Sequence, residues 1–227
     1  LDFWTYCCLN CMHILPDLEH LEERFAGRPF LVIGVHSAKF DNETDRGSVR
    51  AAVQRYGIRH PVVMDEDMRL WRAYRARSWP TRVLVDPAGA IVVSVAGEGR
   101  RAELEQAIAS LLEQHARQGT LAAAPLKLAP DAAVRSASGL SFPGKVLADP
   151  GTGAVPAGGR SAAERRLFIA DTGHHRVVVT SWPDATGRAE LLRVIGSGEP
   201  GREDGPAERA TFRSPQGLAV ARGRLFV

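Results

Sequence analysis

The 227-residue sequence has no cysteine after residue 11. Its three cysteines, Cys7, Cys8 and Cys11, lie close together near the start of the chain, so they cannot join distant parts of a fold. This excludes the disulfide framework of a small secreted domain. We therefore interpret the cysteine cluster as a site rather than as a scaffold.

Long apolar runs and dense stretches of one charge are also missing. No run of about 18 apolar residues is present, so no membrane span is expected in this segment. The net charge is +3, and the basic residues are mostly single arginines with acids among them. A nucleic-acid-binding surface would require a dense basic stripe, so a nucleic-acid partner is not expected.

Both ends of the sequence resemble interrupted strands. Leu1–Trp4 has neither an initiator Met nor a targeting sequence, and Arg224–Val227 stops within a strand-like run. The chain is therefore expected to be a segment of a longer protein. A cytoplasmic location is favoured, while a signal peptide upstream of Leu1 stays open because it would lie outside this sequence.

Residues 1–118 alternate helix and strand signals. Apolar residues recur at helical spacing in some segments, and short apolar runs separate these segments. The turn sequence Asp86–Gly89 predicts an antiparallel hairpin, and the order of segments predicts a mostly parallel α/β sheet that ends in this hairpin. Helices are expected at Met12–Phe25, Arg46–Tyr56, Glu66–Tyr74 and Arg101–Arg117, and strands at Phe30–Val35, His60–Met64, Thr81–Val85 and Ala90–Ala96.

Residues 119–139 are rich in Ala, Pro and Ser and show no lasting period, which is typical of a linker. Residues 140–227 show short strands and dense turns and no helical pattern, so this part is predicted to be all-β. Gly196–Gly201 fits G-x-G-x-x-G, but Pro200 prevents a helix from starting there and no βαβ unit encloses it. Dinucleotide binding is therefore rejected. The strands are expected at Lys145–Ala148, Arg166–Ala170, Arg176–Thr180 and Glu190–Ile195.

Cys8-Leu9-Asn10-Cys11 is a C-x-x-C motif at the junction of a strand and a helix. Backbone N–H groups at a helix N-terminus favour a thiolate, and thiol pKa values there fall from about 8.5 to about 3.5–7.5. Cys11, one turn along, can then resolve a mixed disulfide formed by Cys8. Zinc uses the same spacing but requires about four ligands, and beyond Cys7 and His13 a second ligand pair is missing. No metal or other cofactor is expected.

Four further features accompany the motif. Asp2-Phe3-Trp4 precedes it, Pro16 follows it, Pro80-Thr81 opens a later strand, and a hairpin comes next. This combination resembles the thioredoxin superfamily, and Tyr56–Asp65 resembles the extra segment of its TlpA-like and peroxiredoxin-like branch. The resemblance covers residues 1–117. It implies a thioredoxin fold with an exposed nucleophilic cysteine and a buried resolving cysteine, Cys8 and Cys11.

The resemblance also implies roles for three other residues. Asp2 matches the buried acid that helps to take the proton from the resolving cysteine, and a carboxyl inside an apolar strand is expected to have a raised pKa. Pro80 matches the family's cis-proline opposite the cysteines. The backbone of Trp79 would then face outward and pair with an extended substrate strand.

The motif departs from the family at its first position and between the cysteines. The family usually has Trp where this chain has Cys7; a vicinal disulfide with Cys8 or a third redox partner stays open, and a small buried residue is favoured. Leu9-Asn10 replaces the Gly-Pro of thioredoxins. Because these two positions help to set the reduction potential, both directions of electron flow stay open. His13 is interpreted as a surface histidine rather than one that perturbs Cys8.

In the second half, Phe142–Val146 followed by Leu167–Val177 resembles one NHL repeat, whose hallmark is Asp-x-Gly-Asn-His-Arg between two strands; His174 stands in place of the usual Asn. Asp171 is expected to be structural, its carboxylate accepting N–H groups of the turn. A second copy begins at Phe212, and inserted loops are expected at Asp149–Ala163 and Gly196–Ala210. NHL repeats form β-propellers, so an incomplete propeller is implied.

The order of a thioredoxin-like domain (1–118), a linker (119–139) and the start of an NHL propeller (140–227) resembles the NHL-repeat-containing protein 2 family. It implies a thiol–disulfide oxidoreductase that acts on protein disulfides through Cys8 and Cys11. The alternative is a non-catalytic or redox-sensing scaffold whose propeller binds protein partners. Peroxidase activity is not favoured, because the Pro and Thr pattern before a peroxidatic cysteine is absent.

Overall fold

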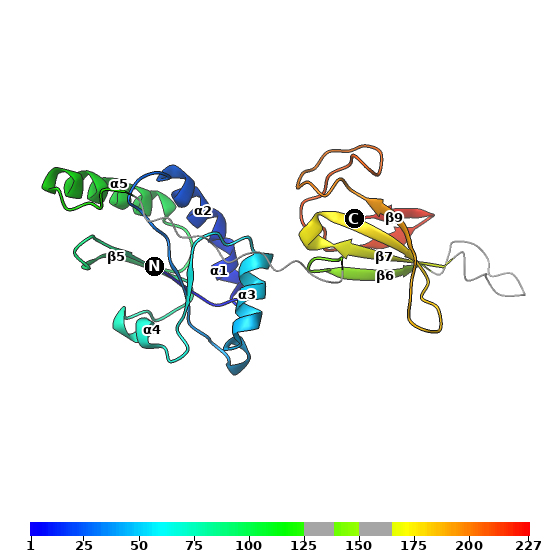
Figure 1. The fold of residues 1–227 in the computed structure, drawn as a ribbon, viewed down its shortest axis with the longest axis horizontal. Helices are drawn as coiled ribbons and strands as arrows, with labels where there is room; N and C mark the ends of the chain where they lie inside the picture. Colours follow the sequence, from blue (N-terminus) through cyan, green and yellow to red (C-terminus); the bar gives the residue numbers. More distant parts are fainter. Residues whose placement is uncertain (125–138, 150–164) are drawn as a thin grey trace, which may run out of the picture. The chain divides into compact units, whose positions relative to one another are not determined.

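The computed structural model describes residues 1–124, 139–149 and 165–227 (Figure 1). The chain divides between residues 133 and 134 into two compact units, each described here by itself. The predicted linker and the predicted loop at Asp149–Ala163 fall mostly outside the described residues, so the domain boundaries stay predictions. Within the described ranges, none of the helices has the length and apolar character needed to cross a membrane.

The first unit is built on a five-stranded sheet in the order β3-β2-β1-β4-β5. The first three strands run parallel to one another, and β4 is antiparallel to both β1 and β5, which confirms the predicted hairpin. The strands are β1 (Asp2–Trp4), β2 (Gly34–His36), β3 (Val62–Met64), β4 (Thr81–Val85) and β5 (Ile91–Ala96). The helices are α1 (Leu9–His13), α2 (Leu15–Arg24), α3 (Arg46–Arg55), α4 (Arg69–Ala73) and α5 (Arg101–Gln118).

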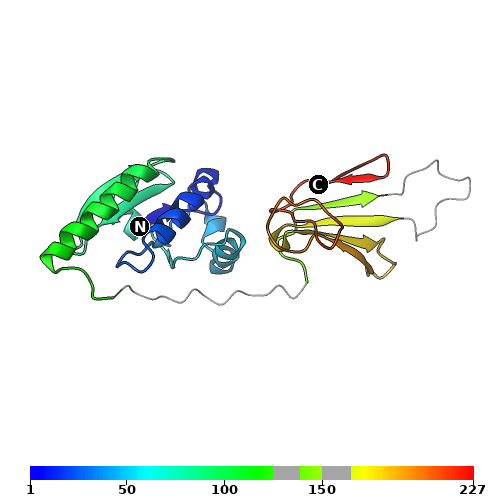
Figure 2. The same ribbon diagram turned by 90° about the horizontal axis from the view of Figure 1, so that it is seen from above.

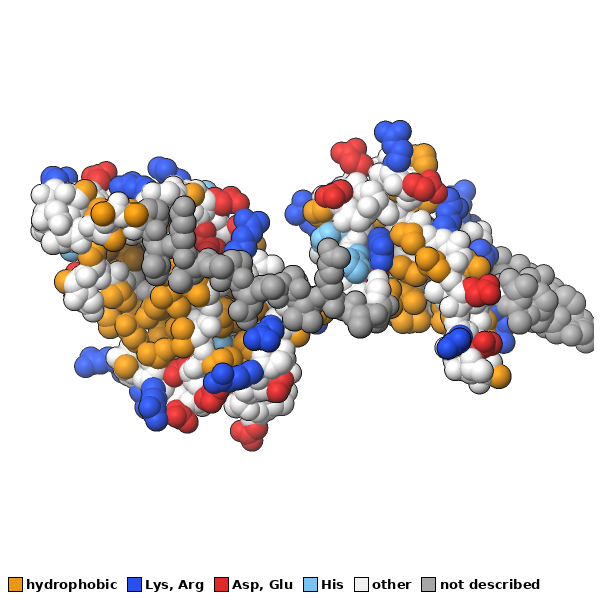
Figure 3. All heavy atoms as spheres, in the orientation of Figure 1, with side chains coloured by type: hydrophobic (Ala, Val, Ile, Leu, Met, Phe, Trp, Pro, Cys, Tyr) orange, Lys and Arg blue, Asp and Glu red, His pale blue; other side chains and the backbone are white. Residues whose placement is uncertain are grey.

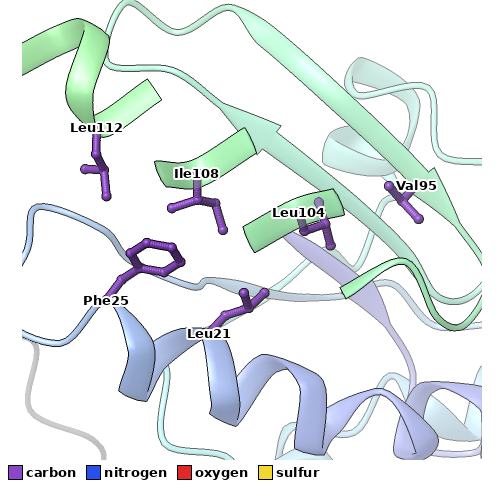
Figure 4. Close-up of a cluster of buried hydrophobic side chains, with 6 residues drawn as sticks. All are labelled: Leu21, Phe25, Val95, Leu104, Ile108 and Leu112. Carbon is purple, nitrogen blue, oxygen red and sulfur yellow. The ribbon is translucent and has the colours of Figure 1, made fainter. Parts of the chain in front are cut away.

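Helices cover both faces of this sheet. Figures 1 and 2 show α2 and α5 on one face, and Figure 1 shows α4 on the other. Between α2, α5 and β5 lies the cluster in Figure 4, which consists of Leu21, Phe25, Val95, Leu104, Ile108 and Leu112. The opposite cluster joins Phe3, Val35 and Val83 to α4. Since strand side chains alternate, Phe3 belongs to the α4 face, whereas Asp2 and Trp4 point to the other.

Three predicted elements differ from the structure by more than two residues. The helix expected at Glu66–Tyr74 is limited to α4, because Glu66 and Asp67 form a turn and Met68 has a left-handed backbone conformation. The strand expected at Phe30–Val35 corresponds to β2, which starts only at Gly34, opposite Asp2, and extends to His36. The helix expected at Met12–Phe25 starts earlier, at Leu9, and is divided at Ile14. Pro16 lies in the first turn of α2, where its missing N–H removes no hydrogen bond.

The described residues of the second unit form strands and turns, as predicted, with one single-turn 3-10 helix, η3 (Thr172–His174), between β7 and β8. Strands β6 (Lys145–Asp149), β7 (Arg166–Asp171), β8 (Arg176–Ser181) and β9 (Leu191–Ile195) form an antiparallel sheet in sequence order. A hairpin of β10 (Ala219–Ala221) and β11 (Arg224–Phe226) follows. Leu218, Val220 and Leu225 pack with Phe168 and Val177, so hairpin and sheet share one core. Gly196–Gly201 forms a loop and starts no helix.

Asp171 lies fully buried at the end of β7, where the chain turns into β8. Its carboxylate accepts hydrogen bonds from Ser141 N at 2.6 Å, His174 Nδ1 at 2.9 Å and Arg176 Nε at 2.8 Å. Gly173 completes the turn, since a Cβ there would meet Ser141 O at 2.9 Å. These contacts agree with the predicted structural role of Asp171.

Replacing Asp171 by Ala is expected to lower the free energy of unfolding of the second unit by about 2–3 kcal/mol. The substitution removes the acceptor of the partly buried Ser141 N–H and of Arg176 Nε, and the Arg176 guanidinium loses its ion pair. Amide hydrogen exchange in β7 and β8, measured by mass spectrometry, reports the loss. The exposed Glu190→Ala variant is the control, with an expected change below about 0.5 kcal/mol. Equal exchange in both variants would contradict the structural role.

Candidate functional site

Cys8 lies at the start of α1, immediately before Leu9. Its Sγ accepts a hydrogen bond from Cys11 N at 3.2 Å, and its carbonyl accepts the N–H groups of Cys11 and Met12. Cys8 is half-buried, whereas Cys11 is buried. An N–H group that points at the sulfur stabilises the thiolate form, so the geometry suits Cys8 to nucleophilic attack.

Cys11 lies behind Cys8 in an apolar cluster. It packs with Trp4 and with Ala52 of α3, and the partly buried rings of Tyr56 and Trp79 lie against the same cluster. Its side chain has no exposed surface. The two cysteines of the motif therefore differ in access to solvent, as the sequence predicted.

Trp79 and Pro80 come immediately before β4, and the peptide bond between them is cis, as predicted. The Trp79 indole donates a hydrogen bond from Nε1 to Ser37 O at 2.9 Å. Its ring also stacks on Trp71, with ring centroids 4.2 Å apart. These contacts hold the Trp79 ring in one position next to the cysteines.

A surface hollow of about 430 Å³ opens beside Cys8. It brings Cys8 and Trp79 together, as predicted, but it does not include Cys11 or Asp2. Its wall comes from the cysteine segment, from the loop after β2 and from the segment before Pro80. The lining residues are Cys7, Cys8, Leu9, Asn10, Lys39, Arg77, Ser78 and Trp79.

Asp2 lies buried in β1, directly opposite Arg82 of β4. Burial raises the pKa of its carboxyl to about 6, and electrostatic interactions with His60, the N-terminal group and Arg82 only partly offset this rise. The predicted rise is thus confirmed. Asp2 lines a different cavity, of about 730 Å³, whose wall is mostly apolar. Figure 3 shows apolar side chains gathered over this part of the first unit, between α5 and α4.

Glu43 was not predicted from the sequence, yet it is fully buried beside the cysteine segment. Its Oε1 accepts from Cys7 N at 3.1 Å and from the Thr5 hydroxyl, and its Oε2 accepts from Lys39 N at 2.6 Å and Phe40 N at 2.9 Å. Burial alone would raise the pKa of Glu43, but these hydrogen bonds hold it below its usual value. No motif spacing could have shown a contact across 36 residues.

Cys7 is exposed, so the expectation of a small buried residue at this position is wrong. Trp4 and Thr5 already fill the buried positions of this segment, and Glu43 holds the Cys7 N–H while the side chain turns toward solvent. Partial desolvation of the thiol, its hydrogen bond to Glu43 and the negative charge of Glu43 raise the pKa of Cys7. Neighbouring Cys7 and Cys8 therefore lie in different electrostatic environments.

Metal binding finds no support in the described residues. No group of three or more His, Cys, Asp or Glu side chains among them could hold a metal ion. His13 is exposed, with Nδ1 at 3.3 Å from Glu98 Oε1, which agrees with its interpretation as a surface histidine.

Residues 1–91 match a protein-family model described as thioredoxin-like. The chain is 46% identical over 222 residues to Protein SUPPRESSOR OF QUENCHING 1, chloroplastic, of Arabidopsis thaliana, a match that covers 96% of this chain and 20% of that protein. It is 40% identical over 230 residues to NHL repeat-containing protein 2 of Homo sapiens, covering 100% of this chain and 29% of that protein.

A more distant relative is the thiol-disulfide oxidoreductase ResA of Bacillus anthracis. It is 28% identical over 105 residues, which cover 46% of this chain and 58% of ResA. The predicted resemblances to thioredoxin-like proteins and to NHL repeat-containing protein 2 are thus confirmed, whereas the NHL propeller stays a prediction. The chain spans less than a third of the length of the first two relatives, and the second unit lies outside the residues that the family model matches.

The raised pKa of Asp2 predicts a pH-dependent stability. Below the unfolded-state pKa of about 4 the carboxyl is protonated in both states, and the stability it confers is lost as pH rises through about 6. Relative to Asp2→Asn, the free energy of unfolding of the parent chain should fall by about 3 kcal/mol between about pH 3.5 and 7.5. Urea unfolding across this range measures it, with the exposed Asp67→Asn as control. A constant difference would contradict the burial of an ionisable carboxyl.

Replacing Glu43 by Gln is expected to speed the alkylation of Cys7 at pH 8 several-fold. The uncharged amide no longer opposes the Cys7 thiolate, which is the species that reacts. Iodoacetamide labelling, resolved by residue with mass spectrometry, measures the rate. Glu98→Gln removes an exposed acid next to His13 and should leave the rate at Cys7 unchanged. An unchanged rate in the Glu43 variant would show that the carboxylate does not act on this thiol.

Proposed function

We propose that the chain is a thiol–disulfide oxidoreductase that acts on protein disulfides through Cys8 and Cys11, because residues 1–91 match a thioredoxin-like family model. The observation that carries the proposal is the pair of unlike thiol positions. Cys8 lies half-buried at the edge of an open hollow with an N–H group on its sulfur, and Cys11 lies buried behind it. The printed name of ResA, a thiol-disulfide oxidoreductase, supports the same chemistry.

In the reducing direction, the Cys8 thiolate attacks one sulfur of the substrate disulfide. A mixed disulfide forms, and the other substrate sulfur leaves as a thiolate that takes up a proton. The Cys11 sulfur, once deprotonated, attacks Cys8 Sγ and releases the second substrate thiolate. Two electrons pass to the substrate, and Cys8 and Cys11 end as a disulfide. The oxidising direction is the same sequence in reverse.

We assign Asp2 to the proton transfer from Cys11. Asp2 and Trp4 point to the same face of β1, and Trp4 packs against Cys11. A carboxyl with a pKa of about 6 exchanges protons near neutral pH, which suits a general base for a buried thiol.

We assign substrate binding to Trp79 and Pro80. Trp79 shares the hollow with Cys8, and its ring is fixed by Ser37 and Trp71. A polypeptide that enters the hollow would meet the backbone of the segment before β4 in an extended form, so that main-chain hydrogen bonds align its disulfide with Cys8.

For the second unit we propose the start of an NHL β-propeller that docks protein partners. The sheet β6–β9 has the meander order of a propeller blade, and the hairpin β10–β11 packs on its core through Leu218 and Leu225. The name of NHL repeat-containing protein 2, which matches the whole chain, supports this assignment. A scaffold without turnover is the alternative function, and the test below decides between the two.

Cys8→Ser is expected to abolish the reduction of insulin disulfides in the presence of a recycling reductant, because the serine hydroxyl does not attack disulfides at neutral pH. Cys11→Ser should accumulate the mixed disulfide between Cys8 and the substrate, which mass spectrometry detects. Cys7→Ser is the matched control: it replaces the neighbouring thiol and should keep most of the activity.

Two results would argue against turnover at this site. If Cys8→Ser reduced insulin as fast as the parent chain, Cys8 would not be the nucleophile. If the parent chain showed no activity above the reductant alone, the scaffold alternative would be favoured.

A further inference from the structure

The hollow beside Cys8 carries charge of one sign. Two of its lining residues are charged, Lys39 and Arg77, and both are exposed basic side chains. They come from different segments, one after β2 and the other before β4, and no Asp or Glu belongs to the lining. Any substrate that brings its disulfide to Cys8 therefore enters a hollow whose charged lining residues are both basic.

Lys39 is held in place by the buried carboxylate of Glu43. Oε2 of Glu43 accepts the backbone N–H of Lys39 at 2.6 Å, while Oε1 accepts that of Cys7 at 3.1 Å. One side chain thus ties the loop that carries Lys39 to the segment that carries the thiols. The Lys39 ammonium lies 5.3 Å from the centroid of the Phe40 ring, which further limits where it can point.

Arg77 is positioned by the segment that leads into β4. Two residues later, the Trp79 ring is fixed by its hydrogen bond to Ser37 O and by its stack on Trp71. Ser37 is in turn held by a hydrogen bond from its hydroxyl to Asp65 at 3.0 Å. In the part of the chain that the structure describes, no acid forms a salt bridge with Arg77, so its guanidinium is available to a ligand.

We infer that the hollow recognises carboxylates next to the disulfide on which it acts, so that its substrate is an acidic disulfide. This inference rests on the proposed function and names its substrate class. Arg77 offers paired N–H donors that match a carboxylate, and Lys39 offers a second positive charge from another segment of the same hollow. The carboxylates come either from Asp or Glu beside a cystine in a polypeptide or from glutathione disulfide, and the experiment below separates these sources.

The test compares two cystine peptides that differ only in the residues flanking the disulfide, Glu in one and Lys in the other. At low ionic strength the full chain should reduce the Glu peptide with a kcat/KM about fivefold higher, as two solvent-exposed ion pairs supply. The preference should shrink in about 0.5 M salt, which screens exposed charges. Lys39→Glu combined with Arg77→Glu should reverse it.

The matched control is Arg28→Gln. Arg28 is exposed, follows the far end of α2 and does not line the hollow, so the variant changes net charge without touching the site. It should keep the full preference for the Glu peptide. Circular dichroism of each variant verifies that the helices are retained.

A binding experiment without turnover tests this inference independently of the proposed function. The Cys8→Ser chain is titrated with each peptide, followed by tryptophan fluorescence, and again with glutathione disulfide and the neutral hydroxyethyl disulfide. If the Glu peptide binds more tightly than the Lys peptide, the carboxylates belong to a polypeptide substrate. If glutathione disulfide binds more tightly than hydroxyethyl disulfide, they belong to glutathione disulfide. Either result supports a carboxylate-binding site. Charge-selective binding without turnover in the parent chain would remove the proposed function and keep the carboxylate site. Equal binding within both pairs would overturn the inference.

Discussion

The central strand β1 is the constraint on which the first unit depends. It pairs with β2 on one edge and with β4 on the other, so neither edge is free, and packed clusters cover both of its faces. Because its side chains alternate, Phe3 enters the core under α4, while Asp2 and Trp4 enter the side that holds Cys11. The strand ends at Trp4, and four residues later Cys8 begins α1. A one-residue change of register would exchange these faces and remove the support behind the thiols.

The sequence predicted those parts of the fold that depend on local pattern. The spacing of apolar residues located α3 and α5 to within one residue, and the turn residues of Asp86–Gly89 located the hairpin. The start of β2 at Gly34 was not predictable from the apolar run Phe30–Val35, because the pairing register with the neighbouring strands sets which residues form the strand. The family resemblance, rather than periodicity, pointed to the cis bond before Pro80.

The site was predictable in its motif but not in its surroundings. Cys8, Cys11 and Trp79 follow from spacing and resemblance. Glu43, Lys39 and Arg77 do not, since their position beside the thiols results from loops that fold back on β1. The wrong prediction at Cys7 has the same origin. Trp4 already fills the core at this point and Glu43 accepts the Cys7 N–H, so the Cys7 side chain is exposed, and neither contact can be deduced from the sequence.

The two units use a buried carboxylate in the same way. Asp171 gathers donors from both sides of a turn in the second unit, and Glu43 gathers donors from two loops in the first. The length of the Glu43 side chain therefore sets the width of the gap between the thiol segment and the loop that carries Lys39. An aspartate there, shorter by one methylene group, could span both only if the loops moved closer together. The width of the hollow beside Cys8 thus depends on the Glu43 side chain. A substitution of Glu43, which does not line the hollow, would change that width.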